Sequence, residues 1–99
     1  MFITVTTSRP KPDQFEKIET FLSKFLPRLE QQSGVVAIYH YVRPERGDDT
    51  TLVIWENQEA VKNYREGSLI QEAVAFEKEL NLPSTREGYP LAYATLFEA

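Results

Sequence analysis

The sequence predicts an α+β fold in which strands and helices follow the ferredoxin-like order β-α-β-β-α-β. Three observations support this prediction. Runs rich in β-branched and aromatic residues occur four times along the 99 residues, and two segments between them carry apolar residues at helical spacing. The two middle strand-like runs are separated only by a short charged loop, which is typical of an antiparallel hairpin. A chain of this length is expected to form a single domain, residues 1–99.

The first strand is expected at Phe2–Thr7 (FITVTT), because β-branched and aromatic side chains favour extended backbone. The segment SRPKP then breaks the strand. Asp13 is placed to cap the following helix, and Glu16 three residues later completes a capping-box-like pair.

The first helix is indicated by a single apolar stripe with spacings of 3, 4, 3 and 4, formed by Phe15, Ile18, Leu22, Phe25 and Leu29. Pro27 lies inside this pattern, and it is expected to kink the helix or to end its regular part near Leu26. Ser33 and Gly34 supply a helix stop.

The two middle strands are expected at Val35–Val42 (VVAIYHYV) and Thr51–Glu56 (TLVIWE). The loop RPERGDD between them is charged and contains proline and glycine. It is therefore expected to be a solvated hairpin tip.

A second helix is expected to begin at Asn57, which is interpreted as its cap rather than as a ligand-binding residue. Glu59 is well placed for the helix dipole. Gly67 is expected to interrupt the helix, after which helical spacing resumes at Leu69, Ala73, Phe76 and Leu80. The segment NLPSTREGYP is read as a loop, and Leu91–Phe97 (LAYATLF) as the fourth strand.

Both faces of this expected sheet carry apolar residues, unlike a sheet with one solvated face. Along the third strand, Leu52 and Ile54 alternate with Val53 and Trp55. A second copy of the same sheet is the simplest cover for the face that the helices leave open. The sequence therefore predicts a homodimer in which two sheets face each other as a dimeric α+β barrel.

Composition argues against several classes of function. The formal net charge is −4 and the pI is about 5.0, with no basic stripe, so neither nucleic acid nor an anionic membrane is expected as a partner. The absence of cysteine excludes disulfides and thiolate chemistry. Because no apolar stretch approaches the ~20 residues of a membrane span and no signal peptide is visible, a cytoplasmic location is expected.

Two segments carry a family resemblance that covers nearly the whole chain. FLPRLEQQSGVVAIYHYVRPE holds a long helix, a proline and a glycine before a strand, and LVIWENQEAVKNY holds a strand, Trp-Glu, a polar cap and Glu-Ala at a helix start. They resemble the antibiotic biosynthesis monooxygenase-like domain family of the dimeric α+β barrel superfamily. The resemblance implies a pocket lined by aromatic residues, either between the sheet and the helices or inside the dimeric barrel.

Members of that family include cofactor-independent monooxygenases acting on polycyclic or quinol substrates, haem-degrading proteins, and proteins without an established activity. The haem-degrading branch uses an Asn on the first strand, a Trp on the third strand and a His on the second helix. Trp55 matches, but the first strand ends in Thr6 and Thr7, and the second helix offers Tyr64 and Arg65 in place of a histidine. These departures argue against haem degradation, and neither a cofactor nor a metal is expected.

Trp55 and His40 are the candidate catalytic residues. If Leu52 and Ile54 pack on the helices, Trp55 points into the barrel, where a flat indole could stack on a planar substrate; the alternative is that it is core or dimer interface. His40 is the only histidine, and its ordinary pKa suits a general base or a partner of a substrate hydroxyl. It could equally be a core histidine, since Ile38 shares its face.

Further candidates for the ligand pocket are Tyr39, Tyr41, Val53, Tyr64, Arg65 and Tyr93. The sheet tyrosines could hold a flat apolar ligand, or they could fill an interface core with their hydroxyls at the rim. Arg65 could polarise an enolate or quinol oxygen. A solvated helix face is the alternative for that arginine.

Two functions are compatible with these residues. In the first, the protein is a monooxygenase-like oxidoreductase acting on a small aromatic or quinol-type substrate, which can donate an electron to O₂ once deprotonated. The protein then need only bind it, remove a proton and exclude water. In the second, it is a non-catalytic dimeric barrel that binds a small hydrophobic ligand or serves as an assembly unit, because fold alone does not decide function.

Overall fold

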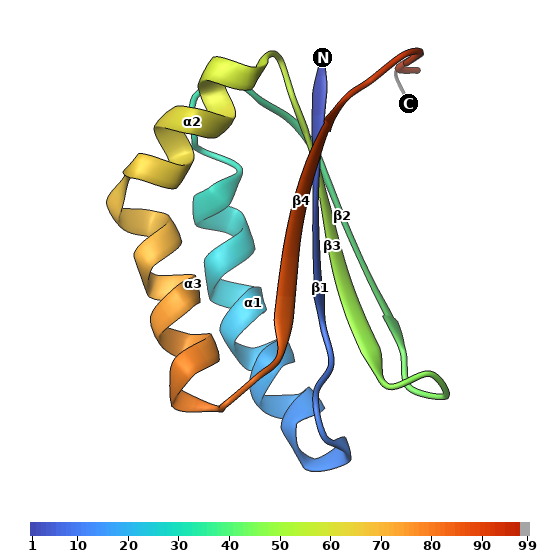
Figure 1. Cartoon of the computed structure of the whole chain (residues 1–99), viewed down its shortest axis with the longest axis vertical. Helices are drawn as coiled ribbons and strands as arrows, with labels where there is room; N and C mark the ends of the chain where they lie inside the picture. The colour runs from blue at the N-terminus through green and yellow to red at the C-terminus, as the bar shows by residue number, and fades with distance from the viewer. Residues whose placement is uncertain (98–99) are drawn as a thin grey trace.

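The computed structural model describes residues 1–97 and shows a sheet covered on one face by helices (Figure 1). The sheet is antiparallel, with the strand order β2-β3-β1-β4. Its strands are β1 (Phe2–Ser8), β2 (Val35–Arg43), β3 (Asp48–Trp55) and β4 (Ser84–Pro90). The helices are a short 3-10 turn η1 (Pro12–Gln14), α1 (Phe15–Leu29), α2 (Gln58–Glu66) and α3 (Ser68–Glu79). The ferredoxin-like α+β arrangement is confirmed, with the second helical segment divided at Gly67.

The fourth strand is Ser84–Pro90, and the expectation of a strand at Leu91–Phe97 is wrong. Its sequence STREGYP looks like a loop, yet all seven residues pair with β1. β1 pairs with β3 on one side, and the backbone N–H and C=O groups on its other side also need hydrogen-bond partners. β4 supplies these partners, and the hydrogen bonds gained outweigh the weak strand propensity of its residues. Beyond the strand, Leu91 donates its N–H to the carbonyl oxygen of Met1 at 3.0 Å.

The start of α1 also differs from the expectation, because Asp13 and Glu16 do not form the cap. Gln14 organises this turn instead. Its side-chain oxygen accepts the Lys11 N–H at 2.9 Å, and its amide donates to the Leu80 carbonyl at 2.9 Å. The long-range bond to Leu80 ties the start of α1 to the end of α3, which no local capping pattern could predict.

The end of α1 lies beyond Pro27, at Leu29, so of the two effects expected of Pro27, a kink or an end near Leu26, the end is wrong. Leu29 is buried in the core, and its packing holds the last turn in place despite the hydrogen bond that Pro27 cannot donate. α1 is the longest helix, at 15 residues. Within residues 1–97, no helix combines the length and the apolar character needed to cross a membrane.

Trp55 faces the helices, and this reverses the orientation considered for β3. Val53 and Trp55 belong to the buried core between sheet and helices, whereas Leu52 and Ile54 alternate with them on the open face. Trp55 lies opposite Phe2 of β1, which is also buried. Both faces of β3 are apolar, so alternation alone does not choose the face that meets the helices. Burial of the large aromatic side chains of Trp55 and Phe2 against the helices favours the observed orientation.

The two segments that carry the family resemblance contact each other at Gly34 and Ala60. Gly34 has a φ of +88°, and a Cβ placed on it would lie 2.5 Å from the Cβ of Ala60. Its carbonyl oxygen accepts the N–H of Glu56 at 2.8 Å. Asn57 caps α2, as expected, because its side-chain oxygen accepts the Ala60 N–H at 2.9 Å. The Gly before β2 and the Glu-Ala at the start of α2 therefore allow close packing of strand and helix.

Candidate functional site

A cavity of about 270 Å³ lies between the sheet and the helices. Its sheet side is formed by β1 and β3, through Thr4, Thr6, Ser8, Asp49, Thr51, Val53 and Trp55. Its helix side is mostly apolar and includes Phe21, Phe25, Tyr64, Val74 and Phe76. Because Asp49, Thr51, Val53 and Trp55 are alternate residues of one strand, the cavity wall changes from polar to apolar along β3.

Trp55 lies at the apolar end of this wall and is held there by two contacts. None of its surface is exposed, and its indole N–H donates to the Thr4 hydroxyl at 3.0 Å. The Tyr64 ring packs on it, with ring centroids 5.3 Å apart and planes tilted by 36°. Because none of the indole is exposed and its N–H is engaged, Trp55 is a core residue here, and the half-buried Tyr64 ring that packs on it is the aromatic group nearer to a ligand.

Tyr64 brings a hydroxyl to the same aromatic end. Burial raises the pKa of Tyr64 to about 12, so its hydroxyl stays protonated at neutral pH. It can therefore donate a hydrogen bond to a ligand, but it cannot act as a base there.

Asp49 and His40 form the polar end of the site. His40 Nε2 lies 2.8 Å from Asp49 Oδ1, and the two side chains are 16% and 5% exposed. The other carboxylate oxygen, Asp49 Oδ2, is buried and has no hydrogen-bond partner among the described residues. The hydrogen bond to Asp49 raises the pKa of His40 against the opposing effect of burial, and Glu19 on α1 adds a smaller favourable charge. The pair thus engages one Asp49 oxygen and leaves the other, Oδ2, available as an acceptor.

The buried position of Asp49 corrects the prediction that RPERGDD is a solvated tip. Asp48, Asp49 and Thr50 are all buried, because β3 begins three residues earlier than expected. Asp48 pairs with Arg43 of β2 at 2.6 Å, and that pair holds the end of the hairpin. Pro44, Glu45 and Arg46 remain as the exposed tip.

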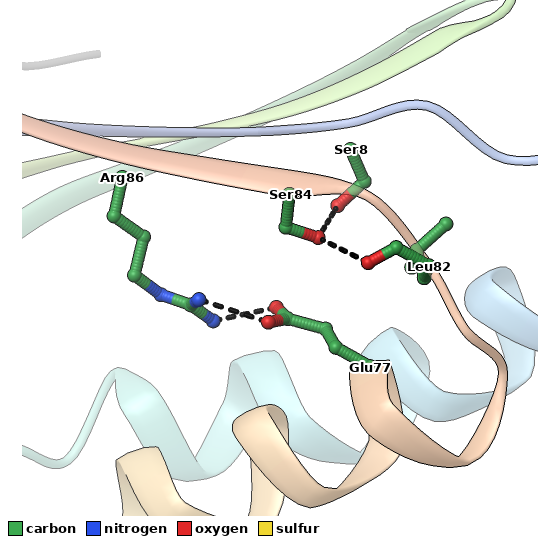
Figure 2. Close-up of polar contacts among 5 residues, drawn as sticks. All are labelled: Ser8, Glu77, Leu82, Ser84 and Arg86. Carbon is green, nitrogen blue, oxygen red and sulfur yellow. Dashed lines mark hydrogen bonds and ion pairs between the residues drawn. The ribbon is translucent and has the colours of Figure 1, made fainter.

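A second ion pair crosses from β4 to α3 at the margin of the cavity. Figure 2 shows Arg86 reaching toward Glu77, with guanidinium–carboxylate distances of 2.9 and 2.5 Å. In the same view the Ser8 and Ser84 hydroxyls lie 3.0 Å apart. This bidentate pair ties β4 to the helix layer, and it is a structural reason for a polar strand at the edge of the sheet.

One group of side chains among the described residues has a spacing that suits a cation. Glu19, His40 and Asp49 each offer a ligand atom, and these atoms lie within 4.8 Å of one another. Glu19 is exposed, and the His40 nitrogen is engaged with Asp49. Sequence spacing does not reveal this group, because its members come from α1, β2 and β3.

The structure divides the residues proposed from the sequence into two sets. Val53, Trp55, Tyr64 and Arg65 line the cavity, and His40 reaches it through Asp49. Tyr39 and Tyr41 lie on the open face, at 58% and 42% exposed, and Tyr93 follows β4 at 85% exposed. These three tyrosines do not line the cavity.

Asp49 is the functional candidate that sequence reasoning missed. The signal was the alternation of β3: once the strand is extended back to Asp48, Asp49 falls on the same face as Thr51, Val53 and Trp55. Of the aromatic residues Phe21 and Phe76, only Phe76 belongs to a helical stripe predicted from the sequence, and Phe21 is not singled out there. Their rings stack with centroids 4.1 Å apart, and both line the cavity.

The His40–Asp49 pair is expected to make stability depend on pH. Because the pKa of folded His40 is raised, its ion pair contributes fully below the unfolded value of about 6.5 and is lost as pH rises through the folded pKa. Wild type should therefore exceed His40→Gln in melting temperature by more at about pH 5.5 than at about pH 9. Thermal unfolding at both pH values measures this, and Glu19→Gln serves as the control for the exposed neighbour. Equal differences at the two pH values would contradict the assignment.

Comparison with protein families gives one match, to the family described as antibiotic biosynthesis monooxygenase, over residues 1–75. The matched residues run from β1 into α3 and include most of the cavity wall. No curated protein matches the chain.

Solved structures show the same fold at low sequence identity. A protein of Deinococcus radiodurans, provisionally described as an antibiotic biosynthesis monooxygenase, has a TM-score of 0.87 at 16% identity, with all of both chains covered. A Nitrosomonas europaea protein of unknown function has a TM-score of 0.81 at 19% identity, covering 99% of this chain and 95% of the other. A Mycobacterium tuberculosis protein has a TM-score of 0.81 at 17% identity, covering 95% and 98%. Since the family model matches 75 of 99 residues, the chain belongs to the antibiotic biosynthesis monooxygenase family.

Proposed function

We propose that the protein binds a planar, electron-rich aromatic compound of the phenol or quinol class in this cavity and catalyses its oxygenation by O₂. The observation that carries the proposal is that the Tyr64 ring, packed on Trp55, and the Asp49 carboxylate line one cavity between the sheet and the helices. The volume of about 270 Å³ lies just below the ~300–1,000 Å³ of typical ligand pockets, which suits two or three fused rings.

The shape of the site favours an elongated ligand. Asp49 and Trp55 are six positions apart on β3, so their Cα atoms are separated by about 20 Å at a strand rise of about 3.3 Å per residue. A linear fused-ring compound has the form that such a cavity requires, with its polar end toward Asp49 and its apolar end toward Trp55.

The proposed reaction balances without an external reductant. A phenol with a free para carbon plus O₂ yields a para-quinone plus water. One oxygen atom enters the ring, and the other leaves as water with the hydroxyl hydrogen and the para hydrogen. All electrons come from the substrate, so the protein's contribution is to hold the ring, exclude water and manage the proton.

Oxygen uptake with 1-hydroxyanthracene tests this function. We expect uptake at least about tenfold above the protein-free rate, with one labelled oxygen atom from ¹⁸O₂ in the 1,4-quinone product. Tyr64→Ala should lose most of the increase, whereas Tyr93→Ala, the same change at an exposed site outside the cavity, should keep it. If wild type showed no uptake above Tyr64→Ala, oxygenation would be excluded. Binding without uptake would then support the non-catalytic, ligand-binding function.

The same proposal includes a homodimer formed through the open sheet face. Strand register places apolar and aromatic residues from all four strands on this face, namely Ile3, Val5, Ala37, Tyr39, Tyr41, Leu52, Ile54 and Tyr89. Tyr39, Tyr41 and Tyr89 are each more than 40% exposed in the single chain. An apolar surface of this extent is typical of an interface, and a second copy offers a complementary surface through a two-fold axis.

A further inference from the structure

We propose that Asp49 binds the hydroxyl group of the ligand through its Oδ2 atom, so that the cavity selects aromatic compounds that carry an O–H donor at one end. This inference rests on the proposed function, because it takes an aromatic ligand to occupy the cavity. It adds the recognition group that the aromatic wall alone does not supply, and it assigns His40 a positioning role.

The first support is the unequal state of the two Asp49 oxygens. Oδ1 is held by His40 Nε2 at 2.8 Å, whereas Oδ2 is buried and has no partner among residues 1–97. The Asp49 side chain is only 5% exposed, and the residue lines the cavity. A buried carboxylate oxygen without a donor is unfavourable, so such an atom marks a place where a ligand donor is accepted.

The second support is the contrast between Asp49 and its neighbour Asp48. Both are buried, but both oxygens of Asp48 are satisfied by Arg43, at 2.9 and 2.6 Å. Asp48 therefore has a structural role at the end of the hairpin. Asp49 lies on the opposite face of the strand, within the cavity, and His40 satisfies only one of its oxygens.

The third support is the distribution of polarity along the cavity. At the level of Asp49, its pairing partner in β1 is Ser8, which is in turn opposite Ser84 of β4. The other end of the cavity is lined by Trp55 and Tyr64. A hydroxyl-bearing ring is thus accommodated at the serine end, and unsubstituted rings at the tryptophan end.

Asp49 also gives the proposed oxygenation a place for the proton. A carboxylate is too weak a base to deprotonate a phenol outright. The proton can, however, pass to Oδ2 in the same step in which the ring gives one electron to O₂, and this leaves an aryloxyl radical beside superoxide. The two radicals join at the para carbon, Asp49 returns the proton to the peroxide, and loss of water gives the quinone. His40 keeps the carboxylate oriented throughout and does not itself touch the substrate.

The test compares 1-hydroxyanthracene with 1-methoxyanthracene, which differ in whether the oxygen carries a hydrogen. Fluorescence titration of the wild-type protein should show at least about tenfold tighter binding of the hydroxy compound, as expected for one hydrogen bond to a charged group. Asp49→Asn should reduce the preference to about twofold or less and suppress oxygen uptake. Asp48→Asn, the same change one position away on the other face, should retain both the preference and the uptake.

Each remaining outcome refutes a stated part of the proposal. Equal binding of the two compounds by wild type overturns the role of Asp49 but leaves an aromatic-binding cavity. This result is obtained with the wild-type protein alone, so it does not depend on whether a variant folds. Failure of both compounds to bind refutes the proposed function itself. A hydroxyl preference that requires added Zn²⁺ and disappears with a chelator would mean that Glu19, His40 and Asp49 hold a cation, and that direct contact with Oδ2 is wrong.

Discussion

Trp55→Ala is expected to lower the free energy of unfolding by about 3–5 kcal/mol, the range for truncating a fully buried tryptophan. The side chain has no exposed surface, and its removal takes away the Tyr64 ring contact together with the donor to Thr4. Urea unfolding followed by far-UV circular dichroism measures the loss, which should appear as a lower midpoint with an unchanged slope.

Two further variants separate packing from hydrogen bonding at Trp55. Trp55→Phe retains an aromatic ring but loses the indole N–H to Thr4, so it should cost less than the alanine change. Tyr93→Ala removes an aromatic side chain that is 85% exposed, and it should change stability by no more than about 0.5 kcal/mol. If Trp55→Ala cost as little as Tyr93→Ala, the indole could not be part of the core.

Leu52→Glu is expected to convert the proposed dimer into a monomer. Leu52 lies on the open face of β3, between Val5 of β1 and Tyr39 of β2, so a charge there would be buried without a partner when two sheets meet. A cost of about 3 kcal/mol or more would raise the dissociation constant at least about a hundredfold.

Sedimentation equilibrium measures this change directly. Wild type should sediment at twice the 11.5 kDa mass of one chain, and Leu52→Glu at the single mass. Ala75→Glu, which places the same charge on the exposed side of α3, should remain a dimer. A wild-type protein that stays monomeric at micromolar concentration would contradict the barrel, because the open face would then be exposed to water.

Local patterns were enough to predict most elements of the fold. The Asn57 cap, the break at Gly67 and the apolar stripe of α1 each depend on neighbouring residues, and all appear in the structure. The fourth strand could not be predicted in this way. Its residues are polar, and they are extended because β1 and the Glu77–Arg86 pair hold them at the sheet edge.

The sequence by itself determined that Val53 and Trp55 share one face of β3 and that Leu52 and Ile54 share the other, because side chains alternate along a strand. It could not determine which face meets the helices, since both are apolar. That choice was made by tertiary packing, which places Trp55 against the helix layer and Leu52 on the open face. Packing also placed Asp49 in the cavity beside His40, because their contact depends on the register of β2 and β3.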